Sequence, residues 1–180
     1  FGVWTKYKGI EVLLDAFALV RAELPDARLI LAGAVGADLD LDGVLQRARV
    51  VGNVDARPGY VPVDGVAPLL DSARVVVTPY IRATQSGVAH LAYTFGRPVV
   101  ATTVGDLPEA VQDGVTGFLV EPGNSEQLAG AMGKLLADPQ LAARLGAAGE
   151  RSVAEAWATA AATVSEALAR AGGGDVAIGS

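Results

Sequence analysis

A loop of small and polar residues at a predicted helix start is the strongest candidate for chemistry in this sequence. The loop Thr84–Gln85–Ser86–Gly87 follows an apolar run and opens a helical segment predicted at 86–95. Free backbone amides and the dipole at a helix start favour an anion, and Gly87 would let a ligand approach the backbone closely. The pattern indicates a phosphate site, although plain N-capping by Thr84 or Ser86 explains the same residues.

Two cations could complete such a site. Lys8 lies in the loop at 5–9, directly before Gly9, where a lysine could reach a phosphate as a point charge. Arg82 precedes the small-residue loop and could pair with a phosphate through its guanidinium group. A solvated loop cation is the alternative interpretation of each residue.

A second loop, Gly105–Asp106–Leu107–Pro108–Glu109, could present further amides to an anion. Asp106 and Glu109 form a predicted capping box with Pro108 in the first turn, so we interpret both carboxylates as helix caps rather than catalysts. Tyr60, followed by Val61 and Pro62, could stack on a base or simply pack against its strand.

The elements that must position these loops alternate along the chain. Apolar runs predict strands at 1–4, 28–32, 54–57, 74–78, 99–102 and 118–120. Helical periodicity predicts helices at 9–24, 41–49, 64–71, 86–95, 106–112, 124–136, 140–151 and 154–171, with Asp64, Asn124 and Asp138 among the caps. This order predicts an α/β fold, a Rossmann-like doubly wound parallel sheet of about six strands with helices on both faces. Ligands bind beyond the carboxyl ends of such strands, where both loops fall.

The length and composition fit one domain of 180 residues, of which 51% are apolar, with a mean hydropathy of +0.37. We assign 1–171 to this domain, with C-terminal helices at 139–171, and expect 172–180 to be a flexible Gly-rich tail. A net charge of −6 argues against nucleic acid as a partner. The chain has no cysteine and only one histidine, His90, so we expect no disulfide and no metal site.

Two stretches carry a resemblance to a known family. GRPVVATTVGDLPEAVQDGVTGFLVEPGN, at 96–124, resembles the C-terminal half of GT-B glycosyltransferases of the group 1 (family 4) type. FGVWTKYKGIEVLLDAF, at 1–17, is similar to the first strand, the Lys–Gly loop and the first helix of that domain. The resemblance covers about residues 1–150, and the last helix is similar to the one that crosses back to the family's N-terminal domain.

The resemblance implies the donor-binding half of a retaining transferase that takes a sugar from a nucleotide-sugar without a metal or other cofactor. It implies that the donor diphosphate binds at Lys8 and at the helix start of Thr84 to Gly87, with Arg82 beside them. The base or sugar would lie near Tyr60–Pro62 and Gly105–Asp106. No catalytic residue is assigned, and the acceptor is expected to be a glycan or a lipid-linked glycan.

The partners implied are the nucleotide-sugar donor and an N-terminal acceptor-binding domain that these 180 residues do not include. The start at Phe1 suggests a fragment of a longer protein, so we expect no transferase activity from this chain alone. We expect a cytoplasmic protein, with peripheral association at the inner face of the membrane left open.

The sequence departs from the family pattern at several positions. Thr5 stands where relatives often have Arg, and Ala83 and Leu91 stand where they commonly have two Glu residues. Gly105–Asp106 replaces the usual Gly–Gly pair. A non-catalytic nucleotide-sugar-binding or regulatory module on the same fold is therefore the main alternative. A GT-B epimerase and a pure interaction domain are the others.

Overall fold

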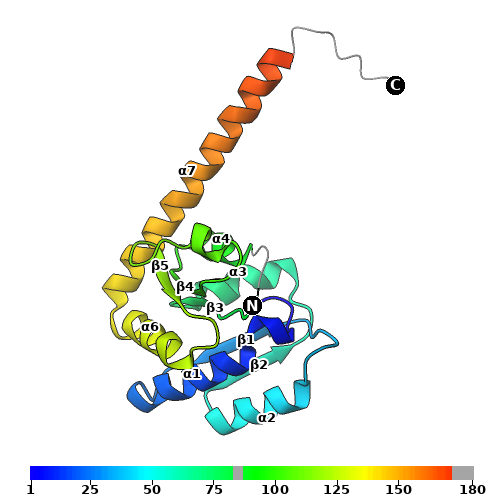
Figure 1. The fold of residues 1–180 in the computed structure, drawn as a ribbon, viewed down its shortest axis with the longest axis vertical. Helices are drawn as coiled ribbons and strands as arrows, with labels where there is room; N and C mark the ends of the chain where they lie inside the picture. Colours follow the sequence, from blue (N-terminus) through cyan, green and yellow to red (C-terminus); the bar gives the residue numbers. More distant parts are fainter. Residues whose placement is uncertain (83–86, 172–180) are drawn as a thin grey trace.

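The computed structural model describes residues 1–82 and 87–171. The elements run in the order η1 (Lys6–Lys8), α1 (Ile10–Glu23), β1 (Leu29–Gly33), α2 (Leu41–Val51), β2 (Val54–Pro58), α3 (Val63–Asp71), β3 (Val76–Thr78), α4 (Val88–Thr94), β4 (Val99–Thr102), α5 (Leu107–Ala110), β5 (Gly117–Val120), α6 (Ser125–Ala137) and α7 (Pro139–Ala171). This alternation confirms the predicted α/β fold (Figure 1).

All strand pairs are parallel, as the alternation of strands and helices predicted. β1 pairs with β2, while β3, β4 and β5 form a second sheet in that order. Five strands form where about six were expected, because the first predicted strand makes only the single bridge between Trp4 and Val35. The described part of the chain therefore contains two short sheets instead of one.

The N-terminal segment connects the two sheets through backbone hydrogen bonds. On the β1 side, Gly2 N donates to Ala32 O at 3.1 Å and Trp4 N donates to Ala34 O at 2.7 Å. On the other side, Ile81 N, just past β3, donates to Tyr7 O at 2.8 Å. The segment thus lies between β1 and β3 at their carboxyl ends.

Helices cover both faces of the sheets, which confirms the doubly wound arrangement. The central strand β4 is buried throughout, and its side chains alternate between two cores. Val100 packs with side chains from α1 and α6, whereas Val99 and Ala101 pack with α4 and α5. α7 contributes to both cores, since Leu145 belongs to the first and Val153 to the second.

The predicted helix caps have mixed outcomes. Asn124 Oδ1 accepts from Gln127 N at 2.9 Å, and Asp138 Oδ1 accepts from two amides at the start of α7, so both caps are confirmed. Asp64 as a cap is wrong, because α3 begins one residue earlier and Pro62 is its N-cap. The capping box at Asp106 is also wrong. Its side chain makes no capping hydrogen bond, and α5 ends at Ala110 because Val111 turns extended and is buried in the core.

The two helices predicted at 140–151 and 154–171 are a single helix of 33 residues. No Gly or Pro separates them, and the Ala-rich sequence favours continuation. Figure 1 shows the C-terminal half of α7 projecting away from the body of the molecule. Trp157, Val164 and Leu168 on this half are exposed. The domain assignment stays a prediction, and the tail at 172–180 lies outside the described residues.

Two glycine substitutions test how α7 packs on α4. A Cβ on Gly149 would lie 2.1 Å from a ring carbon of the buried Tyr93, whereas a Cβ on Gly130 in α6 would meet nothing within 4 Å. Alanine has a higher helix propensity than glycine at both positions, so Gly130→Ala should raise the free energy of unfolding by up to about 1 kcal/mol. Gly149→Ala should lower the free energy of unfolding by about 2 kcal/mol, because the new methyl group overpacks the contact with Tyr93. Urea unfolding measures both, and equal effects would contradict this packing.

Candidate functional site

The loops that follow four strand-like segments meet at the carboxyl edge of the sheets. Besides its bond to Ile81, the η1 loop is tied to the loop after β1, where Lys6 N donates to Asp38 Oδ2 at 3.2 Å. The loop after β3 is tied to β4 through Thr102 Oγ1, which donates to Tyr80 O at 2.7 Å. These bonds place Lys8 in the middle of the edge, where the sequence predicted a site.

Lys8 is held over an aromatic ring. Its Nζ lies 3.7 Å from the centroid of the Tyr80 ring and 5.4 Å from that of Tyr7. The Tyr80 ring is buried, so this cation–π contact forms where water is partly excluded and the attraction is strengthened. A cation fixed in this way at a sheet edge is suited to bind an anionic ligand such as a diphosphate.

Gly9 brings the backbone of η1 against the loop after β3. Its φ of +67° is left-handed, and a Cβ there would lie 1.9 Å from Pro79 O. Only glycine permits both the conformation and the approach. Gly9 therefore fixes the position of Lys8 relative to Tyr80.

Two threonine hydroxyls at this edge are buried. Among the residues that the structure describes, no hydrogen-bond partner is found for Thr5 Oγ1 or Thr78 Oγ1. Thr5 precedes η1, and Thr78 ends β3. Both oxygens are almost inaccessible to solvent, so they lie beneath the surface of the edge and not on it.

The second predicted loop lies at the same edge, directly after β4. Gly105 is exposed with a φ of +57°, and Asp106 is half-buried at the start of α5. Thr102, whose hydroxyl binds the carbonyl of Tyr80, joins this loop to the one that carries Tyr80.

The remaining predicted residues follow β2 and β3, precede α4, or lie outside the described part. Arg82 is exposed after β3, and Gly87 is the exposed N-cap of α4. Tyr60 is 79% exposed after β2, followed by the half-buried Val61 and by Pro62. Thr84, Gln85 and Ser86 lie outside the described residues, so the predicted anion site at their amides stays a prediction.

A buried pair of hydroxyl groups joins helix α4 to the residue directly before β5. Tyr93 Oη and Thr116 Oγ1 lie 2.8 Å apart, and burial raises the pKa of Tyr93 to about 12, which keeps the phenol neutral. Leu91, at one of the positions where relatives commonly have Glu, is half-buried and packs against the second core. His90 on the same helix is exposed.

Sequence reasoning missed the role of Tyr80 and Thr102. The only local signal was an aromatic residue directly after an apolar run, which is equally typical of packing. Within residues 1–82 and 87–171, no three acidic or His side chains gather so that they could hold a metal ion. No helix in the same ranges is long and apolar enough to span a bilayer.

Comparison with known proteins identifies the family of the chain. The family model described as "Glycosyl transferases group 1" matches residues 1–138. A D-inositol 3-phosphate glycosyltransferase from Segniliparus rotundus is 37% identical over 153 residues, which are 83% of this chain and 33% of the relative. The chain thus spans about a third of the length of such relatives.

Solved structures agree on the fold. The C-terminal domain of a group 1 family glycosyl transferase (LpcC) from Francisella tularensis superposes with a TM-score of 0.79 at 23% identity, covering 87% of this chain and 83% of that one. Anabaena Alr3699/HepE in complex with UDP and glucose also gives 0.79, at 24% identity over 94% of this chain and 47% of that one. At these identities the likeness concerns the fold alone. Since the family model covers residues 1–138, the chain belongs to the group 1 glycosyltransferases.

Proposed function

We propose that this chain is the donor-binding half of a retaining glycosyltransferase. The observation that carries the proposal is Lys8, held over the buried Tyr80 ring where the loops after several parallel strands meet. In a group 1 glycosyltransferase this edge would receive the diphosphate of a nucleotide-sugar, with Lys8 neutralising part of its charge. Thr84 to Gly87 and Arg82 would bind the same diphosphate.

The base and sugar would lie on either side of the diphosphate. Tyr60 to Pro62, beyond β2, and Gly105–Asp106, beyond β4, would lie near them. The proposed transfer needs no metal, since Lys8 and backbone amides would supply the positive charge. Leu91 is half-buried against the second core where relatives commonly have Glu, so sugar recognition would rest on other groups.

The acceptor would bind to an N-terminal domain that these 180 residues do not include. A glycan or a lipid-linked glycan is the acceptor class we propose. A phosphorylated polyol should be tested beside it, because the relative named above is a D-inositol 3-phosphate glycosyltransferase. We propose a cytoplasmic protein that can associate peripherally with the inner face of the membrane.

Calorimetric titration of the chain with UDP and GDP tests donor binding. We expect one of the two to bind with a Kd of about 10 μM to 1 mM. The matching nucleoside, uridine or guanosine, should bind at least about tenfold more weakly, because it lacks the charged diphosphate. Circular dichroism checks that the sample is folded.

Failure of both diphosphates to bind a folded sample at millimolar concentration would contradict the proposal. A full-length protein that binds a nucleotide-sugar but neither transfers nor hydrolyses it would favour the non-catalytic module. This chain alone is expected to show no transferase activity, and turnover by it would contradict that expectation.

A further inference from the structure

Two short segments, residues 7–9 and residues 79–81, lie side by side at the carboxyl edge and run in opposite directions. They meet in three pairs, Tyr7 with Ile81, Lys8 with Tyr80 and Gly9 with Pro79. The two outer pairs are contacts of the main chain, and the middle pair is the contact between the ammonium group and the ring. The main chain on both sides therefore places the side chains of Lys8 and Tyr80 against each other.

The Tyr80 ring is fixed by the interior of the protein. Its residue is 3% exposed and belongs to the second core. In a close-packed core, a ring of this size cannot turn away without displacing its neighbours. The ring thus offers Lys8 a surface whose position is set by the core.

Thr102 on β4 fixes the main chain that carries this ring. The pairing between β3 and β4 ends at Thr78 and Ala101. Beyond that pair, Thr102 Oγ1 donates to Tyr80 O at 2.7 Å, and the Thr102 side chain is buried. The hydroxyl group therefore continues the connection between the two strands as far as the residue that contacts Lys8.

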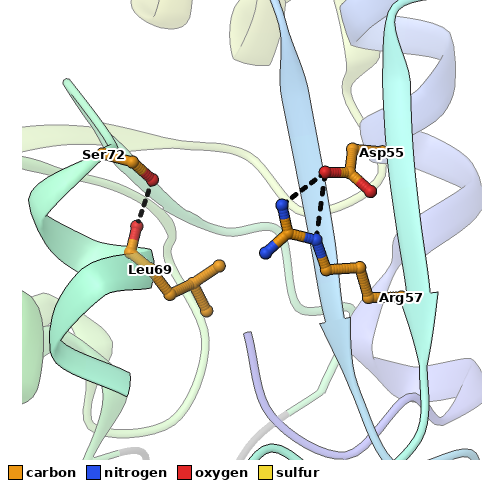
Figure 2. Close-up of polar contacts among 4 residues, drawn as sticks. All are labelled: Asp55, Arg57, Leu69 and Ser72. Carbon is orange, nitrogen blue, oxygen red and sulfur yellow. Dashed lines mark hydrogen bonds and ion pairs between the residues drawn. The ribbon is translucent and has the colours of Figure 1, made fainter. Parts of the chain in front are cut away.

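A second cation of the protein is held in a different way. Figure 2 shows Arg57 on β2 with its guanidinium group held by the carboxylate of Asp55, and Arg57 Nε donates to Asp55 Oδ2 at 3.0 Å. This hydrogen bond lowers the pKa of Asp55, so the carboxylate stays ionised beside the cation. In residues 1–82 and 87–171, by contrast, no carboxylate forms an ion pair with Lys8.

A ring holds a cation without cancelling its charge. The face of an aromatic ring attracts an ammonium group through its quadrupole, and the ring itself carries no net charge. A carboxylate in the same place would neutralise Lys8 and repel a bound phosphate. The Tyr80 ring therefore suits a position where the cation must be held and must still attract an anion.

We propose that Tyr80 and Thr102 are positioning residues for the diphosphate site. Thr102 holds the main chain of Tyr80, and the Tyr80 ring holds the ammonium group of Lys8 where the diphosphate binds. Neither residue needs to touch the ligand, because both act through Lys8. The inference rests on the proposed function for its ligand, whereas the placement of Lys8 is measurable without a ligand.

Two pairs of variants test the proposal. Thr102→Val keeps a branched side chain of similar size but removes the donor, and Thr102→Ser keeps the donor. Tyr80→Leu removes the ring, and Tyr80→Phe keeps it. Circular dichroism checks that each variant is folded, and the Thr102 pair alone decides the test if Tyr80→Leu does not fold.

The position of Lys8 is first measured by NMR on the chain without ligand. Protons held over the face of an aromatic ring resonate upfield, so the ε-methylene protons of Lys8 should lie upfield of those of the exposed Lys6. This upfield shift should be retained in Thr102→Ser and Tyr80→Phe. It should fall by at least about half in Thr102→Val and in Tyr80→Leu.

Calorimetric titration with UDP and GDP then measures the consequence for binding. For the nucleotide that binds, the Kd should rise about fivefold in Thr102→Val and about tenfold in Tyr80→Leu, and should stay within about twofold in Thr102→Ser and Tyr80→Phe. Unchanged affinity in Thr102→Val would overturn the proposal. So would weaker binding by Thr102→Val with the upfield shift of Lys8 intact, because Thr102 would then act by another route.

The two arms separate this inference from the proposed function. If the unaltered chain binds neither nucleotide, the proposed function fails, and the site loses the ligand assigned to it. The NMR comparison still decides whether Tyr80 and Thr102 hold Lys8, and an upfield shift that survives in both Thr102→Val and Tyr80→Leu would show that they do not.

Discussion

Gly9→Ala is expected to destabilise the protein by about 3 kcal/mol or more. The left-handed backbone of Gly9 costs ~1–2 kcal/mol with any Cβ. The new methyl group would in addition lie 1.9 Å from Pro79 O, so the η1 loop must separate from the loop after β3. Urea unfolding followed by circular dichroism measures the loss.

Gly114→Ala is the matched control for this substitution. Gly114 has nearly the same φ, +70°, but a Cβ on it would meet nothing within 4 Å. It should therefore show only the conformational cost of ~1–2 kcal/mol. The difference between the two variants isolates the close approach of η1 to Pro79. Equal losses would show that the two loops do not touch as described.

Replacing Lys8 by Ala is expected to weaken binding of UDP or GDP, whichever binds, by about 10- to 100-fold. The charge removed is the one held over the Tyr80 ring at the carboxyl edge of the sheets. The substitution should cost only about 0.5–2 kcal/mol of stability, the value of the cation–π contact, because Lys8 belongs to neither core. Calorimetric titration of both chains provides the comparison.

Lys6→Ala serves as the control, since Lys6 belongs to the same turn but its side chain is exposed. The only described bond from Lys6 to the next loop uses its backbone amide, which the substitution retains. If the anion is attracted only by nonspecific positive charge, the two substitutions should weaken binding equally. That result would remove Lys8 from the proposed site.

The elements of the fold could be predicted where their signals are local. The buried strand β4 is a continuous apolar run, and the starts of α6 and α7 are set by Asn124 and Asp138, whose caps involve only neighbouring residues. The prediction of a strand at 1–4 was wrong, because an apolar run shows only a propensity for strand. Whether a strand forms depends on partners far along the chain, and in this segment only Trp4 makes a bridge, to Val35.

The site could be predicted only in part for the same reason. Parallel strands bring loops to a common edge, so the location of Lys8 at that edge followed from the order of elements. Its support by Tyr80 did not follow, because the two residues are distant in sequence and meet only when η1 packs on the loop after β3. Thr102 is likewise a buried strand residue until its hydroxyl is seen to bind the carbonyl of Tyr80.

The contact between Lys8 and the Tyr80 ring also has a thermodynamic consequence for any anion that binds there. A free lysine side chain loses up to ~2 kcal/mol of rotamer entropy when it is immobilised. In this protein part of that loss is incurred during folding, because the ring already restricts the side chain. A ligand that meets a preorganised cation therefore retains more of its interaction energy as affinity. The entropy of binding should be less unfavourable than for the same ligand binding to a mobile lysine.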